Sequence, residues 1–129
     1  MSVNLSNEAK LAVAARYATA SRSNDAELFR SLCAPESVTW HNFDGLEVTT
    51  DQTVRTIAWL HSAIADLSWT DVALYPTPTG FVSQTIMTGT VPGGPLEVHS
   101  CVIVILNDAG LIVRAEEYLD TAQTAVLRG

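Results

Sequence analysis

Two adjacent glutamates near the end of the chain are the side chains best suited to chemistry. Glu116 and Glu117 come directly after the largely apolar residues 111–115, and Asp120 follows shortly after them. Because successive side chains of a strand point to opposite faces, the two glutamates cannot share an environment. A carboxylate turned into an apolar cavity would have a raised pKa and would suit general-base catalysis. We expect Glu117 to be that carboxylate; the alternatives are Glu116 or neither glutamate.

A second group of polar side chains lies on the β-rich segment 37–43. Trp40 and Asn42 share one face of a strand, where the Asn42 amide would offer a donor and an acceptor to water or to a substrate oxygen. The alternative is a core tryptophan and an asparagine that only ends the strand. His41 points to the opposite face on this alternation. A strand-end bulge would turn it inward, where an imidazole suits acid–base chemistry near neutral pH.

Two further side chains are candidates with equally plausible structural roles. Tyr17 either donates its hydroxyl to a carbonyl oxygen or is a core tyrosine with a hydrated tip. Asp120 either closes the pocket or pairs with Arg114 or Arg16, and the structural role is favoured.

Composition and charge exclude several function classes. The 129 residues carry seven basic and 14 acidic side chains, for a net charge of −7, and they form no basic cluster. Nucleic acid and anionic membrane surfaces are therefore not expected partners. The histidines, at 41, 61 and 99, match no metal-site spacing, and the two cysteines match no redox motif, so we expect no metal and no cofactor. With no secretory signal and no apolar run of about 18 residues, the expected location is cytoplasmic.

The elements that would position these residues follow from hydrophobic periodicity. Helical spacing begins after Ser6 and runs to about residue 22, and two further helices are predicted at 26–32 and from 52 to about 66. Strands are predicted at 37–43, 68–75, 81–91, 98–106 and 111–120, with a turn at 107–110 and a short helix or tail from Thr121. Helices followed by a run of antiparallel strands indicate an α+β fold, and with no linker or repeat we expect one domain over residues 1–129.

Four segments of this chain resemble the nuclear transport factor 2 fold group. Within it the chain is most similar to SnoaL-like polyketide cyclases, limonene epoxide hydrolase and ketosteroid isomerase. Tyr17 stands where the isomerase has its oxyanion tyrosine, and residues 40–42 stand where the hydrolase has a water-orienting aromatic and asparagine. The closing strand at 110–120 matches the cyclases and the hydrolase, whose catalytic aspartate falls on Glu117. The tail from Thr121 resembles that of the hydrolase.

The resemblance implies a cone in which three N-terminal helices pack in a strongly curved antiparallel (mixed) sheet, a cystatin-like roll. The matched segments also differ from the family. Ile86 and Thr88 stand near the hydrolase's arginine and second aspartate, and Val102 stands near the isomerase's second acid. The cyclases' pocket histidine falls near Val102 or Cys101, close to His99 but out of register.

The combined expectation is a pocket protein that acts on, or binds, a small hydrophobic molecule without a cofactor. Glu117 would be the general base of an isomerase, cyclase, dehydratase or hydrolase, and Asn42, Tyr17 and His41 would place the substrate oxygen. The pocket would also be lined by Trp40, Trp59, Phe81, Ile86, Thr88 and His99. The alternative is a non-catalytic ligand-binding or dimerisation module. Because the central strands are apolar on both faces, we expect a homodimer through the outer sheet face, with the register of strand 98–106 left open.

Overall fold

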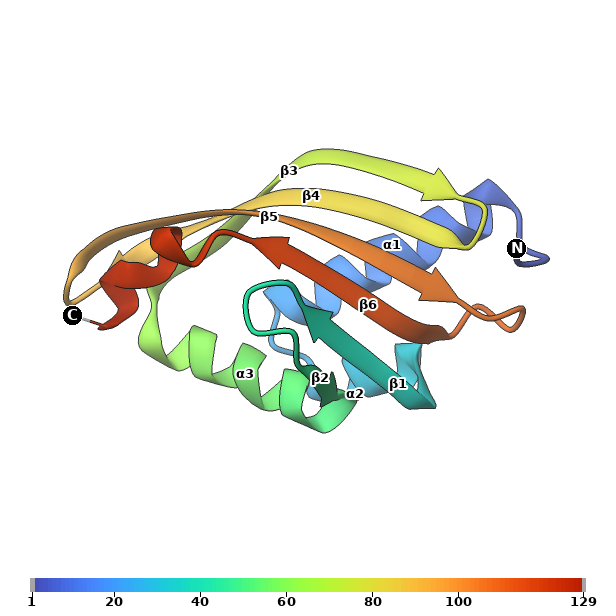
Figure 1. Ribbon diagram of the computed structural model, residues 1–129, viewed down its shortest axis with the longest axis horizontal. Helices are drawn as coiled ribbons and strands as arrows, with labels where there is room; N and C mark the ends of the chain where they lie inside the picture. Colours follow the sequence, from blue (N-terminus) through green and yellow to red (C-terminus); the bar gives the residue numbers. More distant parts are fainter. Residues whose placement is uncertain (1, 129) are drawn as a thin grey trace.

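The computed structural model describes residues 2–128, which form four helical segments and one six-stranded sheet (Figure 1). The helices are α1 (Asn7–Arg22), α2 (Ala26–Leu32), α3 (Thr50–Ala63) and the 3-10 helix η1 (Thr121–Arg128). The strands are β1 (Cys33–His41), β2 (Glu47–Thr49), β3 (Ala65–Thr77), β4 (Gly80–Val91), β5 (Gly94–Leu106) and β6 (Ile112–Leu119). The predicted α+β arrangement of helices against one curved mixed sheet is confirmed.

Side-chain caps fix where the three α-helices begin. Ser6 Oγ accepts the Ala9 N–H at 3.0 Å, and Asp25 Oδ1 accepts the Leu28 N–H at 3.0 Å. At α3, Thr49 and Gln52 form a reciprocal capping box, so the helix begins at Thr50, two residues before the predicted start at residue 52. Of the helices formed by residues 2–128, none has the length and apolar character that a membrane crossing requires.

The sheet has the strand order β2-β1-β6-β5-β4-β3. Only β1 and β6 pair in parallel; every other neighbouring pair is antiparallel. This pairing places β1, from the first third of the chain, beside the carboxylate-bearing strand β6. Figure 1 shows the long strands β3 to β6 arching over α1, with α3 beneath the left part of the sheet. The short edge strand β2 was not predicted from the sequence.

Buried apolar side chains form two separate clusters inside the fold. The larger lies where α1 and α2 meet the sheet and includes Phe29, Phe81 and Val104. The smaller, around Ile64 and Val98, lies toward the end that η1 covers, and Leu127 of η1 packs against it. The site described below is a cavity between these two clusters, because partly buried members of both line it.

Candidate functional site

A cavity of about 340 Å³ opens between the helices and the concave face of the sheet. This volume is at the lower end of the range for small-molecule sites. One wall of the cavity is apolar and includes Leu60, Trp69, Met87, Val98, Leu119 and Leu127. Polar side chains come from β1, β6 and α1, and they include Glu117, His41 and Tyr17. The cavity therefore combines apolar surface with a few ionisable groups, as ligand sites usually do.

Glu117 is the carboxylate of this cavity. It lies on β6 between Glu116 and Tyr118, which point to the opposite, outer face of the sheet. Burial raises the pKa of the Glu117 carboxyl, and the charge of His41 partly opposes that increase. A carboxylate with a raised pKa is a stronger base at neutral pH than an exposed glutamate.

Glu116 occupies a different environment although it is the adjacent residue. Its Oε2 accepts a hydrogen bond from Arg114 Nε at 2.9 Å, and Arg114 also pairs with Glu47 on β2. These ion pairs raise the pKa of the Arg114 guanidinium, with the hydrogen bond to Glu47 as the largest cause. Of the two glutamates, the structure turns Glu117 toward the cavity and Glu116 toward the outer face.

His41 is the neighbour of Glu117 on the next strand. The two residues are paired in the parallel β1–β6 register, and the Asn42 N–H donates to the Glu117 carbonyl oxygen at 3.0 Å. Both side chains line the cavity. The α-carbons of residues paired across neighbouring strands lie about 5 Å apart. Because both side chains also point to the same face, the imidazole and the carboxylate are direct neighbours.

Trp40 and Asn42 lie outside the cavity, so the prediction that they face it is wrong. The Trp40 ring packs against the ring of Tyr118 with 5.5 Å between centroids, on the outer face. Asn42 is exposed, and its Oδ1 accepts the Leu119 N–H at 2.9 Å. The predicted alternation along β1 holds, but the inward face is the one that carries Thr39 and His41. The register of β1 on β6 shifts between Cys33 and Val38, and no sequence pattern marks that shift.

Tyr17 reaches the cavity from α1. Its ring is held between Phe29, at 5.5 Å, and Phe81, at 6.2 Å between centroids. Burial raises the pKa of the Tyr17 hydroxyl, and the nearby Glu117 and Cys33 raise it further. The hydroxyl therefore stays protonated across the physiological range and is available to donate a hydrogen bond.

Asp120 and the six predicted substrate-binding residues do not line the cavity. Asp120 instead accepts the Ala122 N–H at 2.9 Å and so caps η1, rather than pairing with either arginine. Phe81 is fully buried behind Tyr17, whereas Trp59 is half exposed on α3. Ile86 and Thr88 flank the cavity residue Met87 on β4, so they face outward, and His99 contacts Glu97 at 2.9 Å in solvent.

Several cavity residues were missed by the sequence analysis. Trp69 and Met87 lie opposite each other in the β3–β4 register and form part of the apolar wall. A strict period of two from the buried Phe81 leads to Met87 and not to Ile86, so the signal for Met87 was present in the sequence. Ser100, on the inward face of β5, follows from the same alternation.

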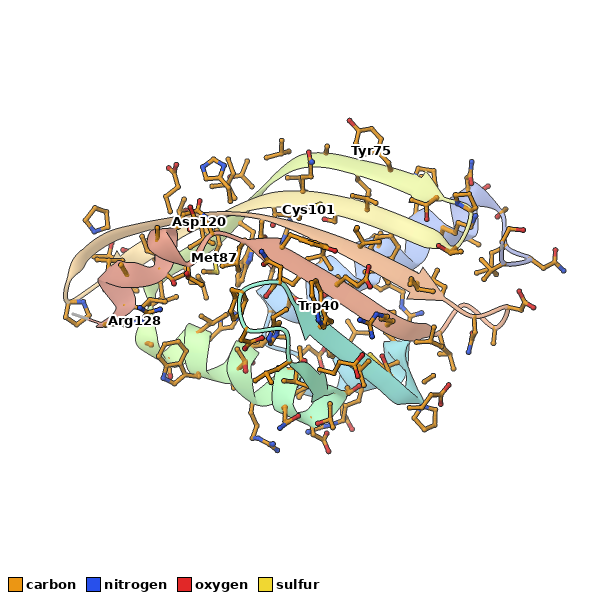
Figure 2. All side chains as sticks on the ribbon, in the orientation of Figure 1. Trp40, Tyr75, Met87, Cys101, Asp120 and Arg128 are labelled. Carbon is orange, nitrogen blue, oxygen red and sulfur yellow. The ribbon has the colours of Figure 1, made fainter. Side chains whose placement is uncertain are left out.

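The C-terminal helix η1 covers one end of the cavity, with Thr121, Thr124, Leu127 and Arg128 in its lining. Figure 2 shows Met87 and Arg128 at this end of the molecule. Gln123 attaches η1 to the sheet: its Oε1 accepts the His99 N–H at 3.0 Å, and its Nε2 donates to the His99 carbonyl at 3.2 Å. The side-chain amide thus extends the β5 hydrogen-bonding pattern beyond Leu119, where β6 ends.

A second hollow, of about 510 Å³, lies near the junction of α2 and β1. Its walls include Arg30 and Asp51, which pair with each other at 2.9 Å. That ion pair lies at the surface, whereas Glu117 faces a largely apolar cavity. We therefore regard the cavity between the two core clusters as the candidate site.

Comparison with known proteins identifies the fold. No family model matches the sequence, and no curated protein matches it either. Solved structures do match, and their sequence identity is low. BvnE pinacolase from Penicillium brevicompactum has a TM-score of 0.81 at 15% identity, over 96% of this chain and 91% of that one. A SnoaL-like protein from Jannaschia sp. CCS1 has a TM-score of 0.77 at 17% identity, over 92% and 94%.

A third match is a protein from Catenulispora acidiphila with a ketosteroid isomerase-like fold, solved in complex with trimethylamine. Its TM-score is 0.73 at 15% identity, over 86% of this chain and 87% of that one. At this level of identity the likeness shows the fold alone. The chain therefore has the fold of the nuclear transport factor 2 group, in its SnoaL-like and ketosteroid isomerase-like form.

Proposed function

We propose that the protein is a cofactor-independent enzyme that uses Glu117 as a general base on a small hydrophobic substrate. The observation that carries this proposal is a partly buried carboxylate in the wall of a largely apolar cavity, where desolvation raises its pKa. Isomerisation, cyclisation, dehydration and hydrolysis can each start with such a base removing a proton from carbon or from water. Perturbed carboxylates in cavities are concentrated at functional sites, which supports the assignment.

Tyr17 and His41 are the proposed hydrogen-bond donors that stabilise the negative charge formed on the substrate oxygen. When Glu117 removes a proton from the carbon beside a carbonyl group, the electron pair moves onto the carbonyl oxygen. A hydrogen bond from the Tyr17 hydroxyl or from the His41 ring stabilises the charge that develops there. Both side chains line the same cavity as Glu117, and His41 is its direct neighbour on β1. Return of the proton to a different carbon completes an isomerisation.

The structural neighbours support a catalytic or a ligand-binding use of this fold. One of them is a pinacolase, and another holds the small organic molecule trimethylamine. The same fold also hosts pockets without chemistry, so the rival function is that of a ligand-binding module.

Deuterium exchange tests the proposed base without knowledge of the natural substrate. The protein is incubated in D₂O with a panel of small cyclic ketones, and exchange at the carbons beside the carbonyl is followed by NMR. We expect exchange with at least one ketone, and a loss of about 10²- to 10⁴-fold in Glu117→Gln, the range for removing a general base. Glu116→Gln, which changes the adjacent residue on the outer face, is the matched control and should keep the wild-type rate.

Two outcomes would count against the enzyme. Ketones that bind, as detected by saturation-transfer NMR, but exchange no faster than in buffer would favour the ligand-binding module. Equal exchange rates in wild type and Glu117→Gln would exclude Glu117 as the base.

The expected partner, in addition to the substrate, is a second copy of the chain docked on the outer sheet face. Three large apolar side chains of that face are exposed: Val72 at 58%, Tyr75 at 59% and Tyr118 at 40%. Figure 2 shows Tyr75 projecting from β3 away from the helices, and Cys101 lies on the same sheet. Apolar side chains left uncovered on one sheet face support self-association there.

A further inference from the structure

The hairpin between β1 and β2 fixes the backbone of His41 through hydrogen bonds to both its N–H and its carbonyl group. The His41 N–H donates to the Leu46 carbonyl at 3.1 Å, and the Gly45 N–H donates to the His41 carbonyl at 2.9 Å. Gly45 has a φ of +68°, which suits glycine, so the turn is tight and defined. Within it, Asp44 Oδ1 accepts the Leu46 N–H at 2.9 Å, which fixes the position of the Asp44 carboxylate.

The Nδ1 atom of His41 faces this carboxylate. Nδ1 is buried, and among residues 2–128 it has no partner with hydrogen-bond geometry. Asp44 Oδ1 lies 3.4 Å from it, slightly beyond hydrogen-bond length. Phe43 stacks on the imidazole with 4.8 Å between centroids and 9° between planes, which limits rotation of the ring. Because buried polar atoms almost always have a partner, a small shift of Asp44 is the simplest way to satisfy Nδ1.

The other ring nitrogen, Nε2, lies on the opposite side of the imidazole. Since His41 lines the cavity and its Nδ1 is buried against the hairpin, Nε2 is the nitrogen presented to the cavity. The charged groups near the ring are Asp44 on its own hairpin and Glu117 on β6. The imidazole therefore stands between an aspartate outside the cavity and a glutamate inside it.

We propose that Asp44 is a positioning residue that keeps a proton on Nδ1 of His41, so that Nε2 is the atom that gains and loses a proton in the cavity. The inference rests on the proposed function and extends it to a residue that does not touch the substrate. A carboxylate beside one ring nitrogen selects the histidine tautomer, as it does where such pairs orient metal-bound or catalytic histidines.

The proton balance of the reaction follows from this arrangement. Glu117 takes the proton from the substrate carbon, and that carbon–hydrogen electron pair becomes part of the enolate. The Nε2–H bond of the His41 imidazolium breaks as its proton moves to the enolate oxygen, which gives an enol and a neutral ring. That neutral ring keeps its remaining proton on Nδ1, facing Asp44. The reverse transfer to Nε2 restores the carbonyl when the proton returns to carbon.

Nitrogen NMR of the His41 ring tests the role of Asp44 without any substrate. The protein, labelled with ¹⁵N-histidine, is measured at a pH at which the ring is neutral, and the two ring-nitrogen shifts give the tautomer ratio. We expect the Nδ1–H tautomer to dominate in wild type. Asp44→Ala should lower the ratio of Nδ1–H to Nε2–H about tenfold, the scale of one hydrogen bond to a charged group. Asp44→Asn, which keeps a weaker acceptor, should lower it by less.

Asp108→Asn is the matched control. Asp108 is also an exposed turn aspartate whose Oδ1 accepts a backbone N–H, that of Asn4 at 2.8 Å. It lies in the hairpin between β5 and β6, so its loss removes one negative charge without touching His41. The ratio of the Nδ1–H to the Nε2–H tautomer of His41 in Asp108→Asn should equal that of wild type.

Three results would overturn the inference. They are a dominant Nε2–H tautomer in wild type, unchanged ratios in both Asp44 variants, or an equal shift in the Asp108 control. If Asp44→Ala loosens the hairpin, as protection of the Leu46 N–H against hydrogen exchange would reveal, the Asp44→Asn ratio decides. Because no substrate is present, a failure here leaves the deuterium-exchange test of Glu117 unaffected, and the reverse also holds.

Discussion

The two faces of strand β6 give the same residue type opposite environments. On the outer face, Glu116 is held by Arg114, which also pairs with Glu47. On the inner face, Glu117 is surrounded by a largely apolar cavity, and only the charge of His41 offsets its burial. One position along the strand therefore separates a surface ion pair from a carboxylate suited to proton transfer. The environment set by the sheet, rather than the residue type, determines which glutamate can act as a base.

After the loss of Glu117 itself, the largest predicted effect concerns the Tyr17 hydroxyl, which shares the cavity with Glu117. Tyr17→Phe removes one hydrogen bond to the developing oxyanion but keeps the ring packed on Phe29 and Phe81. We expect a loss of about 10²-fold in the exchange rate, the scale for one oxyanion donor. The measurement is the deuterium-exchange assay with the same ketones. An unchanged rate would leave Tyr17 with a packing role only.

A charge introduced on the outer sheet face should weaken self-association of the protein. Tyr118→Glu places a carboxylate among the exposed apolar side chains of that face, so it should weaken a dimer formed there by about tenfold or more. Sedimentation equilibrium measures the effect. Trp59→Glu, at a half-exposed apolar position on α3, is the control and should leave the association constant unchanged. A monomeric wild-type protein would contradict the proposed interface.

Stability should depend on pH through the inner glutamate. Because burial raises the pKa of Glu117 in the folded state, its charge costs folding free energy above that pKa, and the cost disappears below the ordinary value of 4.5. Glu117→Gln should therefore match wild type at about pH 4 and become the more stable protein as the pH rises. Each unit of raised pKa corresponds to about 1.4 kcal/mol in the free energy of unfolding.

Urea unfolding at several pH values measures this difference. The difference in free energy of unfolding between the variant and wild type should grow as the pH rises through the folded-state pKa and then remain constant. A variant that is less stable than wild type at about pH 8 would show that Glu117 makes favourable charged interactions instead.

The smallest effect is expected at the outer glutamate. Glu116→Gln removes one surface ion pair with Arg114, which keeps Glu47 as a partner. Surface ion pairs contribute at most about 1 kcal/mol, so the free energy of unfolding should change by less than that. Urea unfolding at neutral pH checks this expectation, and a change well above 1 kcal/mol would mean that the two faces differ less than we infer.

The sequence predicted local structure better than it predicted long-range register. Alternation along the last strand correctly separates Glu116 from Glu117, because it depends only on neighbouring residues. The orientation of Trp40, His41 and Asn42 depends on how β1 pairs with β6, whose paired residues lie 76 positions later in the chain, and on a register shift that no local pattern marks. The choice of face on β1 was therefore inverted.

The C-terminal segment illustrates the same limit. The sequence pattern of residues 121–128 predicts only a short helix or tail, and nothing in it indicates that these residues line a cavity. That role follows from the attachment of Gln123 to His99 across the end of β5, a contact between side chain and backbone. Such contacts depend on where β6 ends relative to β5, which periodicity does not give.

A titration of the Glu117 carboxyl group tests most directly whether this residue can act as the base. Protein labelled with ¹³C at the glutamate carboxyl carbons is followed by NMR across the acidic and neutral range, and Glu117→Gln identifies the signal by its absence. We expect this carbon to titrate above the ordinary glutamate pKa of 4.5, because burial raises the pKa of the Glu117 carboxyl. A titration at or below 4.5 would mean that the carboxylate is hydrated or paired as on the outer face, and would contradict its role as the base.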